Sequence, residues 1–198
     1  MFVTLEGIDR SGKTTQARLL AEALGPETVL VREPGGTEAG ERIRELLADP
    51  AVELDAMSEL LLFCAARAEL VRREIRPAIE AGRDVVCDRF TDSSVAYQGA
   101  ARGLGTEAVA EVCRLATDGL EPDLTVLLRI EPESAGARGN PDDDRFEREG
   151  PRLQRAVADA YDEIARGEPS RVVVVDADRA VEAVHADVIA AVQERRER

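Results

Sequence analysis

A short glycine-rich stretch near the amino terminus constrains this chain more than any other feature. Residues 7–14 read GIDRSGKT, which fits the pattern G-x-x-x-x-G-K-T. The run before it, 2–5, is strand-like, and apolar residues recur at helical spacing over 15–24. A strand, a glycine-rich loop and a helix in this order direct backbone N–H groups and the positive end of the helix dipole at an anion. The sequence therefore predicts a phosphate-binding loop.

The side chains of this loop fit the same prediction. Gly7 and Gly12 let the backbone turn and approach phosphates closely. Lys13 can reach the β- and γ-phosphates of a nucleotide, and the hydroxyl of Thr14 can bind Mg²⁺. Lys13 is also the only lysine, since every other basic residue is an arginine. The loop thus keeps a compact ammonium where a planar guanidinium would fit poorly.

Composition limits the classes of partner. The formal net charge of −14 disfavours nucleic acid polymers and anionic membranes, but not a small phosphorylated ligand at a local cluster of arginines. Three cysteines without a C-x-x-C pair predict reduced core thiols and a cytoplasmic protein. A single histidine, His185, argues against histidine-based catalysis. The sequence shows no membrane span, and its first strand leaves no room for a signal peptide.

Strand-like and helical segments alternate along the chain, which we expect to form one domain over residues 1–198. Alternation of this kind predicts an α/β fold, a five-stranded parallel sheet with helices on both faces. The expected strands are 2–5, 28–32, 84–88, 124–130 and 171–176. The expected helices are 15–24, 38–48, 56–81, 92–99, 106–117, 151–165 and 181–197, with a kink near Pro77. Residues 131–150 lack apolar periodicity and are predicted to be a flexible insert.

Such sheets bind ligands at the carboxyl ends of their strands. Candidate residues there are the phosphate loop, Glu33, Asp88 with Arg89, the insert, and residues 177–178. Asp88 could hold Mg²⁺ through water, although a helix cap or a partner for arginine is the alternative. Arg10 inside the loop could stabilise a transferring phosphoryl group, or it could be a loop-tip charge in water.

Two arginines of the insert, Arg138 and Arg145, could close over a γ-phosphate as part of a lid and exclude water. Solvated surface charges are the alternative for both. If the acceptor is itself a phosphate, its oxygen is already anionic near pH 7, and no general base is required. Arg44 and Arg89 are candidates to hold that acceptor phosphate, with structural ion pairs as the alternative.

Several motifs in one order resemble the thymidylate kinase family. They are LEGIDRSGKTTQ at 5–16, REPGGT at 32–37, LLFCAAR at 61–67, CDRFTDSSVAYQG at 87–99 and DRFERE at 144–149. The resemblance implies phosphoryl transfer from ATP to dTMP, giving dTDP for dTTP synthesis, with Mg²⁺ as cofactor. It also implies a lid insert at about 133–150 on a nucleoside monophosphate kinase fold, and a homodimer formed through long helices.

The resemblance also implies roles for individual residues. Phe63 looks like the ring that stacks on thymine, and Tyr97 like the ring that occupies the space of a ribose 2′-hydroxyl; ordinary helix packing is the alternative for both. Arg67 resembles the donor to the base O4, and Asp9 the carboxylate that meets the 3′-hydroxyl. The implied dTMP-binding set is Asp9, Glu33, Arg44, Phe63, Arg67, Arg89, Ser94, Tyr97 and Gln98.

The implied ATP-binding set is Gly7, Ile8, Asp9, Arg10, Ser11, Gly12, Lys13, Thr14, Thr15 and Arg145, with Asp178 and Arg179 as candidates near adenine. The implied catalytic residues are Lys13, Arg10, Arg89 and Arg138, and the metal-binding residues are Thr14 and Asp88. Family members tend to carry catalytic arginine either in the loop or in the lid. This chain has both, so the sequence leaves the choice between them open.

Two other functions remain as alternatives. One is another nucleoside monophosphate or deoxynucleoside kinase, which would share the loop and the fold. The other is a nucleotide-dependent switch that binds partners rather than making a product. Known guanine-specific switches commonly carry an N-K-x-D loop, and a chain that resembles them would have this motif. Here the only asparagine, Asn140, is followed by proline, and the only lysine lies in the phosphate loop, which argues against a switch.

Overall fold

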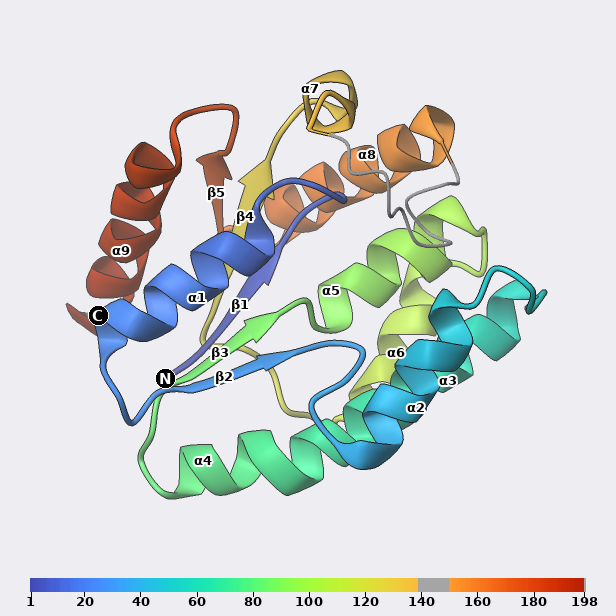
Figure 1. Ribbon diagram of the computed structural model, residues 1–198, viewed down its shortest axis with the longest axis horizontal. Coiled ribbons are helices and arrows are strands. Elements are labelled where there is room, and N and C mark those ends of the chain that lie inside the picture. Colours follow the sequence, from blue (N-terminus) through green and yellow to red (C-terminus); the bar gives the residue numbers. More distant parts are fainter. Residues whose placement is uncertain (139–149, 198) are drawn as a thin grey trace.

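The chain folds around one parallel sheet. A computed structural model describes residues 1–138 and 150–197 (Figure 1). In this described part the strand order is β2-β3-β1-β4-β5, and every pairing is parallel. The strands are β1 Phe2–Glu6, β2 Val29–Arg32, β3 Val85–Asp88, β4 Leu124–Arg129 and β5 Val172–Asp176. The predicted sheet is confirmed, and each strand differs from its expected range by one residue at one end.

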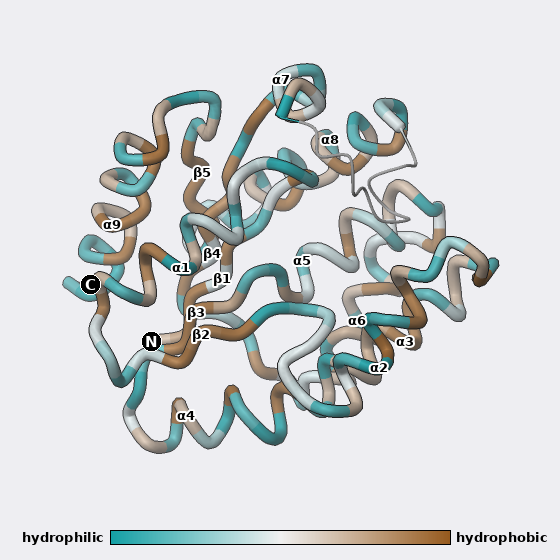
Figure 2. The backbone as a smooth tube through the Cα atoms, in the orientation of Figure 1, coloured by the Kyte–Doolittle hydropathy of each residue, from teal (hydrophilic) through white to brown (hydrophobic). Residues whose placement is uncertain are grey.

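Helices cover both faces of the sheet. On one face α1 (Lys13–Leu24) and α9 (Val181–Glu197) pack against each other and against the strands (Figure 1). On the other face lie α3 (Ala56–Leu70), α4 (Arg76–Glu80) and α8 (Pro151–Gly167). The inner strands β1, β3 and β4 are mainly apolar (Figure 2). This is the composition expected of strands that are buried on both faces.

Two capped helices stand beside the carboxyl ends of β2 and β3. Thr37 begins α2 (Glu38–Ala48), and its Oγ1 accepts a hydrogen bond of 3.0 Å from Gly40 N, as predicted. Asp55 begins α3, where its carboxylate accepts from the backbone N–H groups of Met57 and Ser58. α2 packs against α3, and α3 packs against α6 (Thr106–Ala116). These helices carry side chains toward the same edge of the sheet as the phosphate loop.

The long helix expected over 56–81 runs to residue 80 with a wide π-turn inside it. α3 passes through η1 (Val71–Ile75) directly into α4. Pro77 has no N–H to donate to the carbonyl of Arg73 four residues earlier, so the ordinary hydrogen-bond ladder cannot continue there. The next helix, α5 (Thr91–Ser94), likewise widens into η2 (Val95–Ala101) and ends two residues beyond the expected position at Gly99.

The beginning of the predicted insert forms a short helix that the sequence analysis did not predict. α7 (Pro132–Gly136) begins with proline at its first turn, and the side chains of Pro132 and Ala135 are buried. A helix of one turn is too short to show apolar periodicity in a sequence. Residues 139–149 of the predicted lid lie outside the described residues.

The cysteines are as expected from the sequence: Cys64, Cys87 and Cys113 are buried and not in disulfides. Over residues 1–138 and 150–197, no helix has the length and apolar character needed to span a lipid bilayer.

Candidate active site

The phosphate loop lies between the end of β1 and the start of α1. Gly7 has a φ of 144°, and a Cβ atom there would lie 2.6 Å from the carbonyl oxygen of Leu128, so only glycine fits. Lys13 curls back over the loop and donates hydrogen bonds to Ile8 O (2.6 Å) and Ser11 Oγ (3.3 Å). Burial lowers the pKa of the Lys13 ammonium to about 8. The loop is therefore preformed around a cation.

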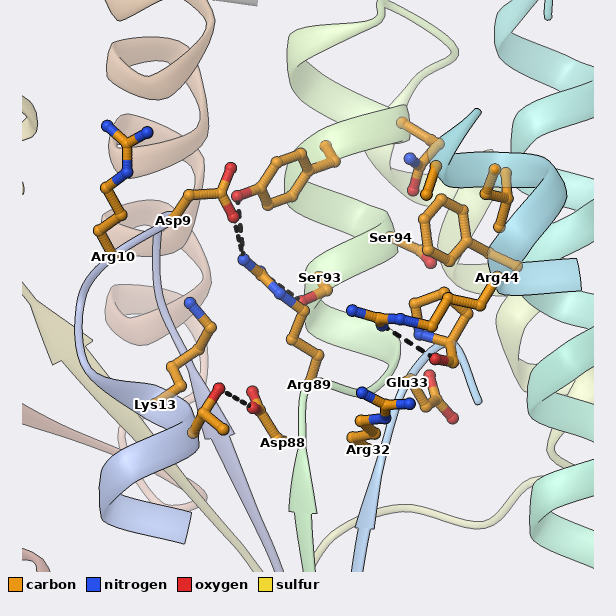
Figure 3. Close-up of a pocket in the computed structure, with 17 residues that line it drawn as sticks. Asp9, Arg10, Lys13, Arg32, Glu33, Arg44, Asp88, Arg89, Ser93 and Ser94 are labelled. Carbon is orange, nitrogen blue, oxygen red and sulfur yellow. Dashed lines mark hydrogen bonds and ion pairs between the residues drawn. The ribbon is translucent and has the colours of Figure 1, made fainter. Parts of the chain in front are cut away.

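Thr14 and Asp88, the two predicted metal-binding residues, are in direct contact. Thr14 Oγ1 donates a hydrogen bond of 2.6 Å to Asp88 Oδ2, which joins the first turn of α1 to the end of β3 (Figure 3). A hydroxyl beside a carboxylate suits Mg²⁺, which prefers oxygen ligands and is usually held by one or two protein groups plus phosphate oxygens. In the described part of the chain, no group of three or more His, Cys, Asp or Glu side chains could hold a metal ion.

Arg89 forms an ion pair with Asp9 across the cavity from Lys13 (Figure 3). Arg89 has a φ of 71°, which is uncommon for a residue other than glycine, and its NH1 donates to Gly7 O at 3.1 Å. Gln154 of α8 binds Asp9 twice: its Oε1 accepts from Asp9 N (3.2 Å) and its Nε2 donates to Asp9 Oδ2 (2.6 Å). Burial raises the pKa of Asp9, but Arg89 and Lys13 more than offset this and the pKa is lowered.

Glu33 and Arg67 form a second, more deeply buried pair. Arg67 Nε donates to Glu33 Oε2 at 2.7 Å, and only 1% of the surface of Arg67 is exposed. Its other two nitrogens donate to Ser94 Oγ (3.1 Å each) and to Phe90 O (3.0 Å). Burial raises the pKa of Glu33 to about 7, although Arg67 opposes this. Glu33 Oε1 is buried without a hydrogen-bond partner among the described residues.

These groups surround one cavity of about 250 Å³ at the carboxyl edge of the sheet (Figure 3). It is lined by Asp9, Arg10, Lys13, Thr14, Arg32, Glu33, Pro34, Arg44, Leu47, Ala48, Phe63, Asp88, Arg89, Ser93, Ser94, Tyr97 and Gln98. We call the part around Asp9, Lys13, Asp88 and Arg89 the loop end. We call the part formed by Phe63, Ser94 and Gln98, which come from α3, α5 and η2, the helical end.

Most side chains predicted to act together from the sequence line this cavity. Arg44 points from α2 toward Arg89 and donates to Pro34 O at 3.1 Å (Figure 3). Tyr97 lies beneath the Arg89 guanidinium, whose Cζ is 5.1 Å from the ring centroid. Gln98 lines the helical end, and its Nε2 donates to Glu59 Oε1 at 2.9 Å. The cavity is therefore lined by the cations Lys13, Arg89 and Arg44, and its helical end also carries an aromatic ring, a hydroxyl and an amide.

Several predicted site residues do not line the cavity: two arginines, Arg67 and Arg138, and the loop residues Gly7, Ile8, Ser11, Gly12 and Thr15. Arg67 lies behind Ser94. Arg138 lies on the outer side of the loop, where it donates to Arg10 O (3.3 Å) and to Ala177 O (2.9 Å). Arg10 itself lines the cavity at the end remote from Arg44 (Figure 3). Arg145 lies outside the described residues.

The sequence did not single out four residues that hold the site together: Glu6, Ser93, Gln154 and Tyr161. Glu6 gave one usable signal, because it is a charged residue at the end of an otherwise apolar strand. Ser93 stands between two motif residues. Gln154 and Tyr161 gave no signal, since each acts on a residue about 70 to 150 positions away in the chain.

Comparison with known proteins agrees with this geometry. The model of the family described as thymidylate kinase matches residues 5–188. A thymidylate kinase of Deinococcus radiodurans is 46% identical, with 98% of this chain and 97% of that relative covered. One of Symbiobacterium thermophilum is 47% identical over 98% of this chain and 93% of that relative. The chain belongs to the thymidylate kinase family.

The fold of this thymidylate kinase family member is also found in a solved structure. The crystal structure of thymidylate kinase from Ehrlichia chaffeensis matches with a TM-score of 0.79 and 36% sequence identity, covering 97% of this chain and 98% of that one. The likeness therefore spans nearly the whole of both chains. The predicted family and fold are therefore confirmed.

Proposed function

We propose that this member of the thymidylate kinase family binds dTMP in the cavity and transfers the terminal phosphoryl group of ATP to it. The reaction is the ATP-dependent phosphorylation of dTMP to dTDP. The observation that supports it best is the convergence of Lys13, Arg44 and Arg89 on one cavity whose helical end carries Phe63 and Gln98. Cations suit two phosphate chains that meet end to end, and an aromatic ring suits a pyrimidine base.

In this proposal the donor phosphates lie on the loop and the acceptor phosphate lies between Arg44 and Arg89. Phosphoryl transfer requires in-line placement of the two phosphates and stabilisation of the charge that develops between them. Lys13 is already fixed over the loop and Arg89 is fixed by Asp9, so neither must be reoriented at the moment of reaction. No general base is needed, because the attacking phosphate oxygen is anionic.

We propose that Mg²⁺ binds beside Thr14 and Asp88. Their contact of 2.6 Å between Oγ1 and Oδ2 places a hydroxyl beside a carboxylate, and these are oxygen ligands of the kind that Mg²⁺ prefers. When bound, Mg²⁺ would neutralise part of the phosphate charge. The two residues that would hold the metal come from two elements, Thr14 from α1 and Asp88 from β3.

At the helical end we propose that Phe63 stacks on thymine and that Ser94 and Gln98 bind its polar edge. The unpartnered Glu33 Oε1 offers an acceptor for a donor group of dTMP. A direct hydrogen bond from Arg67 to the base stays a prediction, and it would require one of the bonds from Arg67 to be exchanged. The position of Tyr97 against Arg89 supports a role in selecting deoxyribose.

We further propose a cytoplasmic homodimer that supplies dTDP for dTTP synthesis. Met57 and Leu61 on α3 are 46% and 54% exposed, and Leu115 on α6 is 66% exposed. Large apolar side chains gathered on neighbouring helices suit an interface between subunits. Light scattering would measure the mass in solution, and a monomer at micromolar concentration would contradict this part of the proposal.

Turnover with a panel of acceptors tests the function. ADP release would be measured with dTMP, dUMP, UMP, GMP and thymidine, each with ATP and Mg²⁺. We expect the highest kcat/KM with dTMP. Preference for another monophosphate or for thymidine would indicate a different nucleotide kinase, and ATP hydrolysis without an acceptor would indicate a switch. A Lys13→Ala variant purified in the same way controls for contaminating kinases.

A further inference from the structure

A buried carboxylate lies directly beneath the phosphate loop and has no role in the reaction described so far. Glu6 is the last residue of β1, and none of its surface is exposed. Its Oε1 accepts a hydrogen bond of 2.7 Å from Phe90 N. Its Oε2 accepts from Ser93 Oγ (2.6 Å) and from Tyr161 OH (2.7 Å). The carboxylate thus connects β1 to the segment after β3 and to α8.

The same two hydroxyl groups also face Arg89. Arg89 NH1 lies 3.2 Å from Ser93 Oγ and 3.5 Å from Tyr161 OH. Each hydroxyl has one proton, and a carboxylate accepts but cannot donate. When both hydroxyls donate to Glu6, their lone pairs stay available for the guanidinium of Arg89. The guanidinium of Arg89 therefore donates to the two hydroxyls, and the two hydroxyls donate to Glu6.

Arg89 needs such support. An arginine side chain is long and loses much rotational freedom when it is held in one place. Its backbone is in the left-handed region, with φ at 71°, so the chain by itself does not favour this placement. One nitrogen, NH2, is held by Asp9 and Tyr97, both of which line the cavity. The other, NH1, is held only by Gly7 O, Ser93 and Tyr161 among the contacts of the described residues.

We propose that Glu6 and Tyr161 are positioning residues that hold Arg89 ready for the acceptor phosphate, so that α8 helps to set the affinity for that phosphate. This inference rests on the proposed placement of the acceptor phosphate at Arg89. Neither residue touches the substrate in the proposed complex. Gln154 lies about two turns before Tyr161 on α8 and binds Asp9, so the same helix contacts both members of the Asp9–Arg89 pair.

The test separates phosphate recognition from base recognition. Binding of dTMP and of thymidine, which lacks the phosphate, would be measured by calorimetry with wild type and Tyr161→Phe. This substitution removes one hydroxyl and keeps the buried ring. We expect the affinity for dTMP to fall by about fivefold, the size of one lost hydrogen bond, and the affinity for thymidine to stay unchanged. Glu6→Gln should lower dTMP affinity further, by about tenfold or more, because an amide keeps only one accepting oxygen for the three donors that Glu6 binds.

A matched control lies on the same helix. Val157 is fully buried on α8, four residues before Tyr161, and makes no contact with Arg89 among the described interactions. Val157→Ala should lower the melting temperature but leave the ratio of dTMP to thymidine affinity as in wild type. If Glu6→Gln does not fold, Tyr161→Phe carries the test alone.

The outcomes distinguish this inference from the proposed function. Wild type that prefers dTMP over thymidine, with an unchanged preference in Tyr161→Phe, would overturn the inference and leave the proposed function intact. An equal loss of affinity for both ligands would also overturn it, because that loss would report a general structural effect. Wild type that binds both ligands equally would overturn the placement of the phosphate at Arg89, and the inference with it.

Discussion

The two ends of the cavity are built in different ways. At the loop end, charged groups from distant parts of the chain meet and fix one another: Lys13 lies on backbone and hydroxyl oxygens, and Asp9 pairs with Arg89. At the helical end, the buried charge of Arg67 lies behind the wall, already paired with Glu33. The loop end thus presents charge to a ligand, whereas the helical end presents an aromatic ring, a hydroxyl and one amide. The difference predicts that phosphate recognition and base recognition can be removed separately.

The largest effect is expected at the loop end from Lys13→Ala. Removing the ammonium should lower kcat by roughly 10³-fold, because a preorganised charge at the transferring group is lost. The fold should remain, since a buried cation contributes little net stability. Steady-state kinetics and a thermal melt measure the two effects. Wild-type turnover by this variant would remove Lys13 from the mechanism.

Arg89→Ala should lower kcat/KM for dTMP by about 10²-fold, because the proposed contact of Arg89 is with the acceptor phosphate. Thymidine binding should stay near the wild-type value, because thymidine has no phosphate. Kinetics with dTMP and calorimetry with thymidine measure this. Arg83→Ala is the control, since Arg83 precedes β3 at the opposite edge of the sheet and donates to Glu27 O. Comparable losses for thymidine would mean that the two ends are not separable.

The Arg10→Ala substitution should lower kcat more than Arg138→Ala does. Arg10 lines the cavity, whereas the Arg138 guanidinium is bound to backbone carbonyls outside it. We expect kcat to fall roughly 30-fold in the first variant and about threefold in the second. A coupled assay of ADP release compares them. Equal losses would assign catalysis to the two arginines jointly.

At the helical end, Phe63→Ala should weaken dTMP and thymidine binding by the same factor, roughly 20-fold, which is the size expected for loss of one stacked base. Calorimetry with both ligands measures it, and kcat at saturating dTMP should change little. A loss confined to dTMP would place the phosphate, not the base, beside Phe63.

The last effect is a dependence on pH. Burial lowers the pKa of Lys13 to about 8, so the free enzyme loses this charge as the pH rises above that value. kcat/KM for ATP, which reports the free enzyme, should therefore fall about tenfold for each pH unit above 8. Bound phosphates favour the charged form, so kcat should fall only at higher pH. A flat kcat/KM up to pH 9.5 would contradict this.

Much of the loop end could be predicted from the sequence, because a local motif determines it. The pattern at 7–14 places Lys13 and Thr14 relative to one backbone turn, and the strand that ends at Asp88 brings Asp88 to the same edge. The contact between Thr14 and Asp88 follows from the parallel sheet, in which β1 and β3 are neighbours.

The supporting contacts could not be predicted, because they join segments far apart in the sequence. Nothing local shows that Gln154 binds Asp9 or that Tyr161 and Glu6 share a hydrogen bond. Arg67 fits a motif, but only the packing of α3 against Glu33 and Ser94 places its guanidinium behind the cavity wall. The short helix α7 was not predicted for a local reason: at five residues it is too short to show apolar periodicity.

The most direct test of the central claim is a crystal structure with dTMP and an unreactive ATP analogue bound together. The account predicts the triphosphate on the amides of residues 7–14, the dTMP phosphate in contact with Arg44 and Arg89, and thymine against Phe63. A dTMP molecule bound in the reverse direction, or a triphosphate away from the loop, would contradict it.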